Sequence, residues 1–396
     1  IQGKYQHGKY DRRPVAGKDL TLGLDIRLQA LGERMLEGKI GAIVAIEPST
    51  GQVLCMVSSP SYDPRLLEGK LRNKYHRALS KNVWKPLLNR AIMGQYPPGS
   101  TFKTAQGLTF LTEGIINTHT QYPCHHGFSY KGLHVGCHGH PSPLAIIPAI
   151  STSCNGFFCW GLYHMFANRM KYPKVQIAMN TWRDYMVSMG FGYKLGIDLP
   201  GEKRGLIPNA AFYDKAYHGS WNGLTVISIA IGQGEVNLTP LQIANLASTI
   251  ANRGYYYIPH VVKDVKGGSI DKKYYQRHYT KAAPWAYNVI VAGMRSSAMG
   301  GTCKHFSTLN FPACGKTGTA QNRGQDHSVC MAFAPMDKPK IALAVYVENG
   351  GFGADFAVPM ATVLMDQYIN GKLSPARARE ADELQKRRIA YGSRNR

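Results

Sequence analysis

A serine and a lysine three residues apart, Ser100 and Lys103, are the first residues in the chain whose types and spacing could do chemistry. Two prolines and a glycine at 97–99 precede them, so a helix can begin only near Ser100. Residues at this spacing share one face of a helix, about 5–6 Å apart at their β-carbons. Lys103 can accept the proton of Ser100 if burial or a second cation lowers its pKa from the usual value of about 10.4. Taken alone, the pair fits equally well an N-capping serine beside a solvated lysine.

Two further segments hold residue types that would complete such a site. Residues 151–158 read STSCNGFF and contain Ser153 and Asn155, and residues 314–321 read CGKTGTAQ and contain Lys316. The patterns S-x-x-K, S-x-N and K-T-G, in this chain order, are the motif set of class A β-lactamases and penicillin-binding proteins. Each motif alone has a plain structural alternative: an N-cap, a turn former or an edge-strand charge. Their occurrence together and in order favours a catalytic site.

The elements that must position these residues follow from periodicity and turn signals. The predicted elements are helices over 25–38, 100–114 and 239–254, a β-hairpin over 41–60, and strands over 313–321, 328–335 and 340–350. The two ends of the chain are therefore expected to build one sheet, while the long middle part builds a mostly helical lobe. A site is expected in the cleft where the lobe meets the sheet.

Nearly the whole chain, from about residue 20 to about residue 372, resembles class B penicillin-binding proteins, specifically the elongation-type penicillin-binding protein 2. The stretches that carry the resemblance are LTLGLDIRLQ (20–29), LLNRAIMGQYPPGSTFK (87–103), PGEKRGLIP (200–208), AIGQGEVNLTPLQIANLASTIANRG (230–254) and GKTGTAQN (315–322). The resemblance implies an α+β fold of the penicillin-binding protein and serine β-lactamase type. That fold has a five-stranded antiparallel sheet flanked by helices, plus a mostly helical lobe.

The resemblance implies D,D-transpeptidation of peptidoglycan during cell elongation. Ser100 would attack the carbonyl between two D-alanines of a stem peptide, release the terminal D-alanine and form an acyl-enzyme. An amine of a neighbouring strand would then accept the acyl group and complete a cross-link. In this scheme Lys103 is the base for Ser100, Ser153 relays a proton to the leaving amine, and Asn155 orients Lys103 and the substrate amide.

The K-T-G segment would complete the site in the same scheme. Lys316 would add positive potential, which favours a neutral Lys103 and attracts the substrate carboxylate. The hydroxyl groups of Thr317 and Thr319 are candidates to bind that carboxylate, and the backbone N–H of Thr319 would form an oxyanion hole with that of Ser100. Gly318 would let the substrate backbone pair closely with this edge strand. β-Lactams, which mimic the D-Ala-D-Ala terminus, are expected inhibitors.

A cluster of thiols and imidazoles lies between the first two motifs. Three of the eight cysteines and five histidines occur between residues 124 and 154, at separations that can make a tetrahedral zinc site. Some elongation-type family members carry a zinc in this interval, and by order the resemblance implies Cys124, Cys137, His140 and Cys154 as ligands, with His138 as the substitute for His140. Four protein ligands would make the metal structural, and catalysis itself is expected to need no cofactor. The alternative is a Cys124–Cys137 disulfide with Cys154 merely buried.

The resemblance also predicts domain organisation and location. Residues 1–20 would end a linker or N-terminal pedestal, 21–374 would form the transpeptidase domain, and 375–396 would be a basic C-terminal tail. The family places such a domain in the bacterial cell envelope, on the periplasmic side of the inner membrane. The chain begins at Ile1 and has no apolar run near the ~18–20 residues of a membrane span, so the anchor is expected to precede it.

Charge leaves several partner classes open. The chain has 47 basic and 24 acidic residues, a formal net charge of +23, but apart from the C-terminal segment the basic residues are scattered. No nucleic-acid-binding module is recognisable, so no nucleic-acid partner is expected, whereas an anionic polymer or membrane surface suits the charge. The expected partners are stem peptides ending in D-Ala-D-Ala, β-lactam inhibitors, and a membrane glycosyltransferase with other proteins of the rod complex.

Three classes of function are compatible with these sequence features. The first is the cross-linking transpeptidase, with a D,D-carboxypeptidase as its near relative. The second is a β-lactamase or β-lactam sensor of the same fold, and no glutamate is evident in the position that compact β-lactamases use to activate the deacylating water. The third is a non-catalytic protein that uses its charge to bind anions. The intact motif set favours the first.

Overall fold

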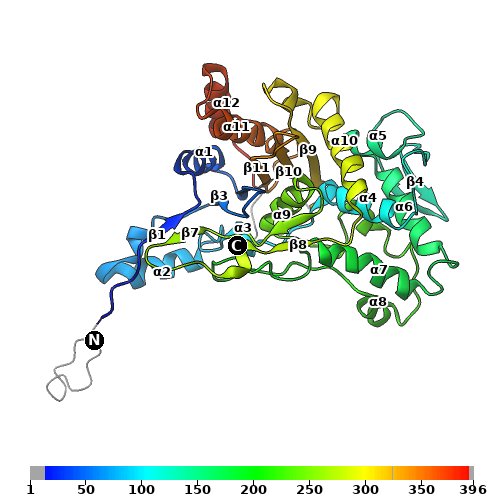
Figure 1. Cartoon of the computed structure of the whole chain (residues 1–396), viewed down its shortest axis with the longest axis horizontal. Helices are drawn as coiled ribbons and strands as arrows, with labels where there is room; N and C mark the ends of the chain where they lie inside the picture. Colours follow the sequence, from blue (N-terminus) through cyan, green and yellow to red (C-terminus); the bar gives the residue numbers. More distant parts are fainter. Residues whose placement is uncertain (1–13, 323, 392–396) are drawn as a thin grey trace, which may run out of the picture.

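A five-stranded antiparallel sheet forms the centre of the computed structural model, which describes residues 14–322 and 324–391 (Figure 1). The strands are β2 (Gly41–Ile46), β3 (Val53–Ser59), β9 (Cys314–Ala320), β10 (His327–Ala334) and β11 (Ile341–Val347), in the order β3-β2-β11-β10-β9. The early hairpin thus joins the three late strands through β2 and β11, and β9 is left as an edge strand. The predicted α+β fold with a five-stranded antiparallel sheet is confirmed.

Helices cover both faces of this sheet. On one face lie α1 (Ile26–Leu36), α11 (Ala357–Asn370) and α12 (Pro375–Lys386), and on the other lies α9 (Pro240–Ala251), against β11. Leu343 and Val345 of β11 pack with the first group, whereas Ala344 and Tyr346 belong to the core that includes α9. Both faces are therefore buried, which explains why these strands appear in the sequence as continuous apolar runs.

Most of the residues between β3 and β9 build the helical lobe on the right of Figure 1. Its main helices are α4 (Lys103–Thr112), α5 (Ile146–Ser151), α6 (Asn155–Ala167), α7 (Val175–Ser188), α8 (Ala210–Tyr217) and α10 (Pro284–Gly300). A small hairpin, β4 (Gly127–Tyr130) and β5 (Leu133–Gly136), lies beside α6. Helix α9 begins at Thr239, whose side chain forms a capping box with Gln242, as its Thr signal predicts.

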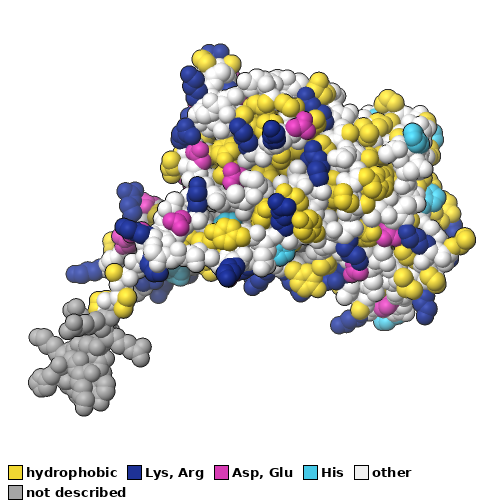
Figure 2. All heavy atoms as spheres, viewed as in Figure 1, with side chains coloured by type: hydrophobic (Ala, Val, Ile, Leu, Met, Phe, Trp, Pro, Cys, Tyr) yellow, Lys and Arg dark blue, Asp and Glu magenta, His cyan; other side chains and the backbone are white. Residues whose placement is uncertain are grey.

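The remaining elements are short. They are the helices α2 (Arg72–Lys81) and α3 (Arg90–Met93) and the strands β1 (Leu20–Leu22), β6 (Tyr255–Tyr257), β7 (Val262–Val265) and β8 (Arg277–Tyr279). No helix among the described residues is long and apolar enough to cross a membrane. Figure 2 shows Lys and Arg side chains spread over the visible face rather than gathered in one patch.

The C-terminal segment differs from the expected basic tail. Residues 375–386 form α12, which Ser374 caps and which has Pro375 in its first turn. Ala381 and Leu384, three residues apart on one helical face, are buried in the same core as α1 and α11. The segment is rich in charged residues and has only a narrow apolar stripe, so its composition alone predicts an exposed basic tail.

Candidate active site

Ser100 faces a cleft of about 800 Å³ that is lined by residues of the helical lobe and of the edge strand β9. It lies in a short 3-10 turn, Gly99–Phe102, which leads directly into α4. Gly99 has a φ of +55°, and a β-carbon there would lie 2.7 Å from the carbonyl oxygen of Thr319. The turn that carries Ser100 therefore packs directly against β9, and only glycine fits at its start.

A second contact holds this turn from the side of residues 229–234. The N–H of Gly99 donates to the carbonyl oxygen of Gly232 across 3.0 Å, and Gly232 itself has a φ of +70°. The side-chain amide of Gln233 donates to the carbonyl oxygen of Thr319 at 3.3 Å. Motif reasoning assigned no role to this stretch, although the pair of glycines around Gln233 is a signal of close backbone approach.

Lys103 is fully buried, and its amine lies against the S-x-N segment. Its Nζ donates to the carbonyl oxygen of Ser153 at 2.6 Å, to the Oδ1 of Asn155 at 2.6 Å and to the hydroxyl of Ser153 at 3.3 Å. The Nδ2 of Asn155 donates to the carbonyl oxygen of Gly136 in β5 at 2.7 Å. Asn155 thus holds Lys103 from one side and the β4–β5 hairpin from the other.

Ser153 lies between two buried lysines. Lys316 of β9, which has no exposed surface, donates to the hydroxyl of Ser153 at 2.7 Å and to the carbonyl oxygen of Thr317 at 3.0 Å. Ser153 has a φ of +60°, an uncommon conformation for a residue other than glycine, between α5 and α6. Such local strain is characteristic of functional sites. The five predicted catalytic residues are thus brought to one place from three segments of the chain.

Burial shifts both lysines toward the neutral form. Burial lowers the pKa of Lys103 to about 8, although the thiolates of Cys137 and its neighbours act in the opposite direction. Burial also lowers the pKa of Lys316 to about 7, and the charge of Lys103 adds to this effect. Two ammonium groups around one hydroxyl in a dry pocket repel each other, so the pair loses its first proton near neutral pH.

Thr317, Gly318 and Thr319, which we predicted to contact the substrate, have different surroundings in the structure. Thr319 lines the cleft, whereas the hydroxyl of Thr317 donates to that of Thr302 at 2.8 Å, and it is Thr302 that lines the cleft. A β-carbon on Gly318 would lie 2.9 Å from the carbonyl oxygen of Pro98. Gly318 is thus required for packing of β9 against the nucleophile turn, a reason different from the close approach of substrate that we expected.

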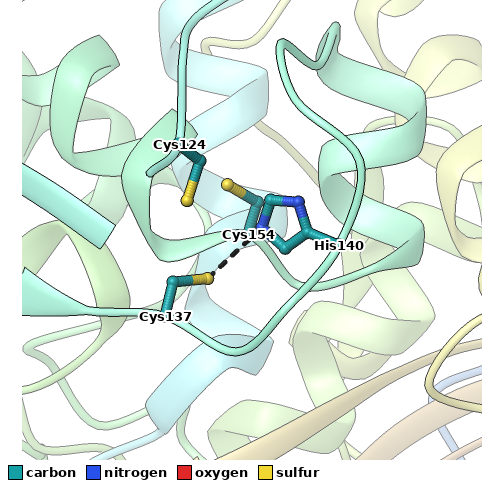
Figure 3. Close-up of side chains that lie close together, drawn as sticks. All are labelled: Cys124, Cys137, His140 and Cys154. Atoms are coloured by element: carbon teal, nitrogen blue, oxygen red, sulfur yellow. Dashed lines mark hydrogen bonds between the residues drawn. The ribbon is translucent and has the colours of Figure 1, made fainter. Parts of the chain in front are cut away.

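The four predicted metal ligands also come together. The ligand atoms of Cys124, Cys137, His140 and Cys154 lie within 4.8 Å of one another and point toward a common centre (Figure 3). This set does not include His138, the expected substitute. All eight cysteines lie in the described residues and all are free thiols, so the alternative Cys124–Cys137 disulfide is not formed.

The chemistry of this cluster fits a tetrahedral divalent cation. Cys137 Sγ and His140 Nε2 are 3.4 Å apart, and ligands on a tetrahedral zinc with bonds of about 2.0–2.3 Å are about 3.5–3.8 Å apart. His140 Nδ1 lies 2.8 Å from the carbonyl oxygen of Pro141, which favours the tautomer that leaves Nε2 free to bind a metal. A hydrogen bond from Cys154 lowers the pKa of the Cys137 thiol, and the same contact raises the pKa of Cys154. Ionisation of one thiol therefore opposes ionisation of the others, and a bound cation would remove this opposition.

The cluster is built into the catalytic segment. The N–H of Asn155 donates to Cys137 Sγ at 3.2 Å, and Cys154 caps α6 by accepting from the N–H of Phe157 at 3.3 Å. A β-carbon on Gly156 would lie 2.9 Å from Cys124 Sγ, so glycine is needed there. The ligands Cys137 and Cys154 therefore position Ser153 and Asn155, which lie next to them.

Several further residues line the cleft and were not predicted from motifs. They are His134, Val135, Gly136, Ser228, Ile231, Gln233, Thr302, Gln321, Asp326 and Phe352. Most come from loops far apart in sequence, where no local pattern identifies them.

Comparisons with known proteins identify the family. Residues 41–366 match the penicillin binding protein transpeptidase domain. The chain is 34% identical over 388 residues to the peptidoglycan D,D-transpeptidase MrdA of Acinetobacter baumannii, covering 90% of the chain and 54% of that relative. The chain thus spans about half the length of this curated relative.

Solved structures that resemble this chain point to the same family. A penicillin-binding protein 2 of Pseudomonas aeruginosa has a TM-score of 0.81 and 31% identity, covering 92% of this chain and 80% of that one. The penicillin-binding protein 2 in a complex with MreC from Helicobacter pylori has a TM-score of 0.77 and 27% identity to this chain. The match covers 89% of this chain and 64% of that one. The chain belongs to the penicillin-binding protein transpeptidase family, and within it to the class B, elongation-type penicillin-binding protein 2 group.

Proposed function

We propose that this domain is a serine D,D-transpeptidase that cross-links peptidoglycan stem peptides and is acylated by β-lactams. The observation that carries the proposal is the placement of Ser153 between the buried amines of Lys103 and Lys316, beside Ser100 in one cleft. This arrangement supplies a nucleophile, a base and a path for a proton within a single pocket.

In the first half-reaction the hydroxyl oxygen of Ser100 bonds to the carbonyl carbon between two D-alanines. Lys103, in its neutral form, takes the proton of Ser100. The proton reaches the leaving amine through Ser153, and the C–N bond breaks as the terminal D-alanine departs. The backbone N–H groups of Ser100 and Thr319 stabilise the oxyanion, and Lys316 and Thr319 attract the substrate carboxylate.

In the second half-reaction the amine of a neighbouring strand attacks the acyl carbon. Its proton returns along the same route to Ser100 as the ester bond breaks. The position of β9 at the edge of the sheet formed by the described residues supports binding of the donor peptide as an added strand.

Zinc is proposed as a structural ion held by Cys124, Cys137, His140 and Cys154. When bound, it would tie the segment that carries Ser153 and Asn155 to Cys124 and Cys137. The side chain of Asn155, fixed next to Cys154, keeps Lys103 directed at Ser153.

The setting is also a proposal. The Helicobacter pylori protein is found in a complex with MreC, which supports a rod-complex protein of that kind as a partner of this domain. A membrane glycosyltransferase is proposed as a further partner because the family resemblance implies it. Action on the periplasmic side of the inner membrane is consistent with that setting. Residues 21–374 are proposed as the catalytic domain, and α12 packs against it. The predicted linker, residues 1–20, lies mostly outside the described residues, which begin at residue 14.

The direct test is intact-protein mass spectrometry after treatment with benzylpenicillin. One stable adduct that maps to Ser100, and that Ser100→Ala abolishes, is the expected result. An equal adduct on Ser100→Ala would refute the assignment of the nucleophile, and rapid release of hydrolysed penicillin would favour a β-lactamase.

A further inference from the structure

The segment that leads into the nucleophile turn contacts β11, the central strand of the sheet. Tyr346 of β11 has no exposed surface, and its hydroxyl donates to the carbonyl oxygen of Pro97 at 3.2 Å. The ring of Tyr96 stacks on the ring of Tyr346, with their centroids 4.3 Å apart and their planes at 22°. One buried side chain of the central strand thus contacts two consecutive residues shortly before Ser100.

A buried carboxylate directly after β11 holds the hydroxyl end of Tyr96. The hydroxyl donates to Oε1 of Glu348 at 2.9 Å, and Nε of Arg90 donates to the same oxygen at 3.3 Å. Arg90 is 1% exposed and Glu348 is 8% exposed, so water screens this ion pair little. The guanidinium of Arg90 also donates to the carbonyl oxygens of Trp84 and Lys85, at 2.7 and 3.2 Å. The carboxylate therefore has a fixed place.

The backbone on either side of this contact is held as well. The N–H of Tyr96 donates to the carbonyl oxygen of Leu238 at 2.9 Å, and the N–H of Leu238 donates back at 2.8 Å. Pro97 and Pro98 have a restricted φ, so a fixed Tyr96 sets the direction in which the chain enters the turn. The hydroxyl of Thr101 then donates to the carbonyl oxygen of Pro98 at 2.7 Å, within the turn itself.

Stability alone does not explain an ion pair at this place. Well-packed apolar side chains of similar volume often stabilise a protein as much as a buried ion pair does. Hydrogen bonds to a charged group are directional, however, and apolar packing is not. Direction matters here, because a displacement of the reacting atoms by about 1 Å can slow an enzymatic reaction by about 100-fold.

We propose that Tyr96, Tyr346 and Glu348 are positioning residues for the nucleophile: they fix the segment before Ser100 against the central strand. None of the three lines the cleft, so they act on the reaction only through the position of Ser100. The inference rests on the proposed function and adds that part of the acylation rate depends on residues outside the cleft.

The test separates binding of benzylpenicillin from its reaction. The rate of adduct formation, measured against penicillin concentration, gives the dissociation constant of the non-covalent complex and the first-order rate constant of acylation. Tyr96→Phe/Tyr346→Phe removes both hydroxyls and keeps both rings. The first-order rate constant is expected to fall by about tenfold, and the dissociation constant to stay within about twofold, because the residues that line the cleft are unchanged.

Tyr213→Phe/Tyr287→Phe is the matched control. Both tyrosines are fully buried, and neither lines the cleft. The hydroxyl of Tyr213 donates to Glu235 at 2.7 Å, and that of Tyr287 shares a hydrogen bond of 2.7 Å with Thr280. This variant also loses two bonded hydroxyls, so its unfolding temperature should fall while both acylation constants remain normal.

A pair of substitutions at Glu348 tests the carboxylate itself. Glu348→Gln and Glu348→Leu both remove the charge that faces Arg90, so both should lower the unfolding temperature. Only Gln keeps an oxygen that can accept from Tyr96. The first-order rate constant of acylation should therefore be about fivefold higher in Glu348→Gln than in Glu348→Leu.

The positioning role is overturned if the Tyr96→Phe/Tyr346→Phe protein keeps the normal first-order rate constant, or changes only the dissociation constant. The same conclusion follows if the control variant loses as much acylation rate, since the loss would then reflect general destabilisation. Each of these results leaves the proposed function intact. Absence of a penicillin adduct on the unmodified protein would instead overturn the proposed function, and this inference with it.

Discussion

The Nζ of Lys316 lies 2.7 Å from the hydroxyl oxygen of Ser153, although the two residues are 163 positions apart in the chain. This bond joins the edge strand of the sheet to the segment between α5 and α6 of the helical lobe. The side chain of Ser153 thus connects the two walls of the cleft. In the proposed mechanism both lysines act through Ser153, so its removal should affect catalysis more than stability.

Ser153→Ala is expected to slow acylation by benzylpenicillin by about 100-fold or more, the usual contribution of a positioned proton-transfer group. The measurement is the rate of adduct formation by stopped-flow or quenched mass spectrometry. Ser220→Ala, at an exposed position outside the cleft, is the matched control and should react at the normal rate. A Ser153→Ala protein that reacts as fast as the control would remove Ser153 from the proton path.

The pH dependence of acylation should follow the two buried lysines. Their pKa values, about 8 for Lys103 and about 7 for Lys316, are lowered from the ordinary value, so raising the pH from 6 to 9 removes a proton that blocks the base. Loss of the first proton frees the base, whereas loss of the second removes the positive charge that attracts the substrate carboxylate, so the acylation rate should pass through a maximum within this window. A rate that is constant between pH 6 and 9 would contradict a lysine base with a lowered pKa.

The candidate catalytic residues could be picked out because each motif is short and its chemistry follows from residue type. The structure brings Ser100, Lys103, Ser153, Asn155 and Lys316 together as the motif order implied. The supporting contacts could not be predicted in this way. Thr302 meets Thr317, and Gly232 meets Gly99, only because separate segments pack against each other, and no local pattern specifies those partners.

The limits of sequence reasoning also appear in α12 and Gly318. The buried face of α12 consists of Ala381 and Leu384 among many charged residues, so average composition outweighs the spacing signal. Gly318 was predicted to give room to the substrate backbone, and the close neighbour that the structure shows is the carbonyl of Pro98 in the same chain. Spacing can indicate that room is needed without showing which atoms need it.

Metal content provides an independent prediction. Freshly purified protein should contain about one equivalent of zinc, and a content below about 0.2 equivalents would contradict a structural site. Cys154→Ser should lose the metal and lower the acylation rate, because Ser153 and Asn155 flank this ligand. Cys55→Ala, which removes a buried thiol of β3 outside the cluster, should retain the metal.

The packing of the nucleophile turn can be tested with a pair of glycines. Gly232 and Gly114 have similar left-handed conformations, with φ of +70° and +65°. Alanine at either position costs about 1–2 kcal/mol of backbone strain. At Gly232 the new β-carbon would also lie 2.3 Å from the carbonyl oxygen of Gly99, whereas at Gly114 it meets no atom within 4 Å.

Gly232→Ala should therefore displace the turn that carries Ser100 and slow acylation by at least about tenfold at a temperature where the protein remains folded. Gly114→Ala should show the strain cost alone, as a lower unfolding temperature with a normal acylation rate. Circular dichroism reports folding and penicillin adduct formation reports the site, so the two effects are separable. If both variants acylate at the same rate, contact between Gly232 and Gly99 does not position the nucleophile, and the link between β9 and the turn at Thr319 must be sufficient to do so.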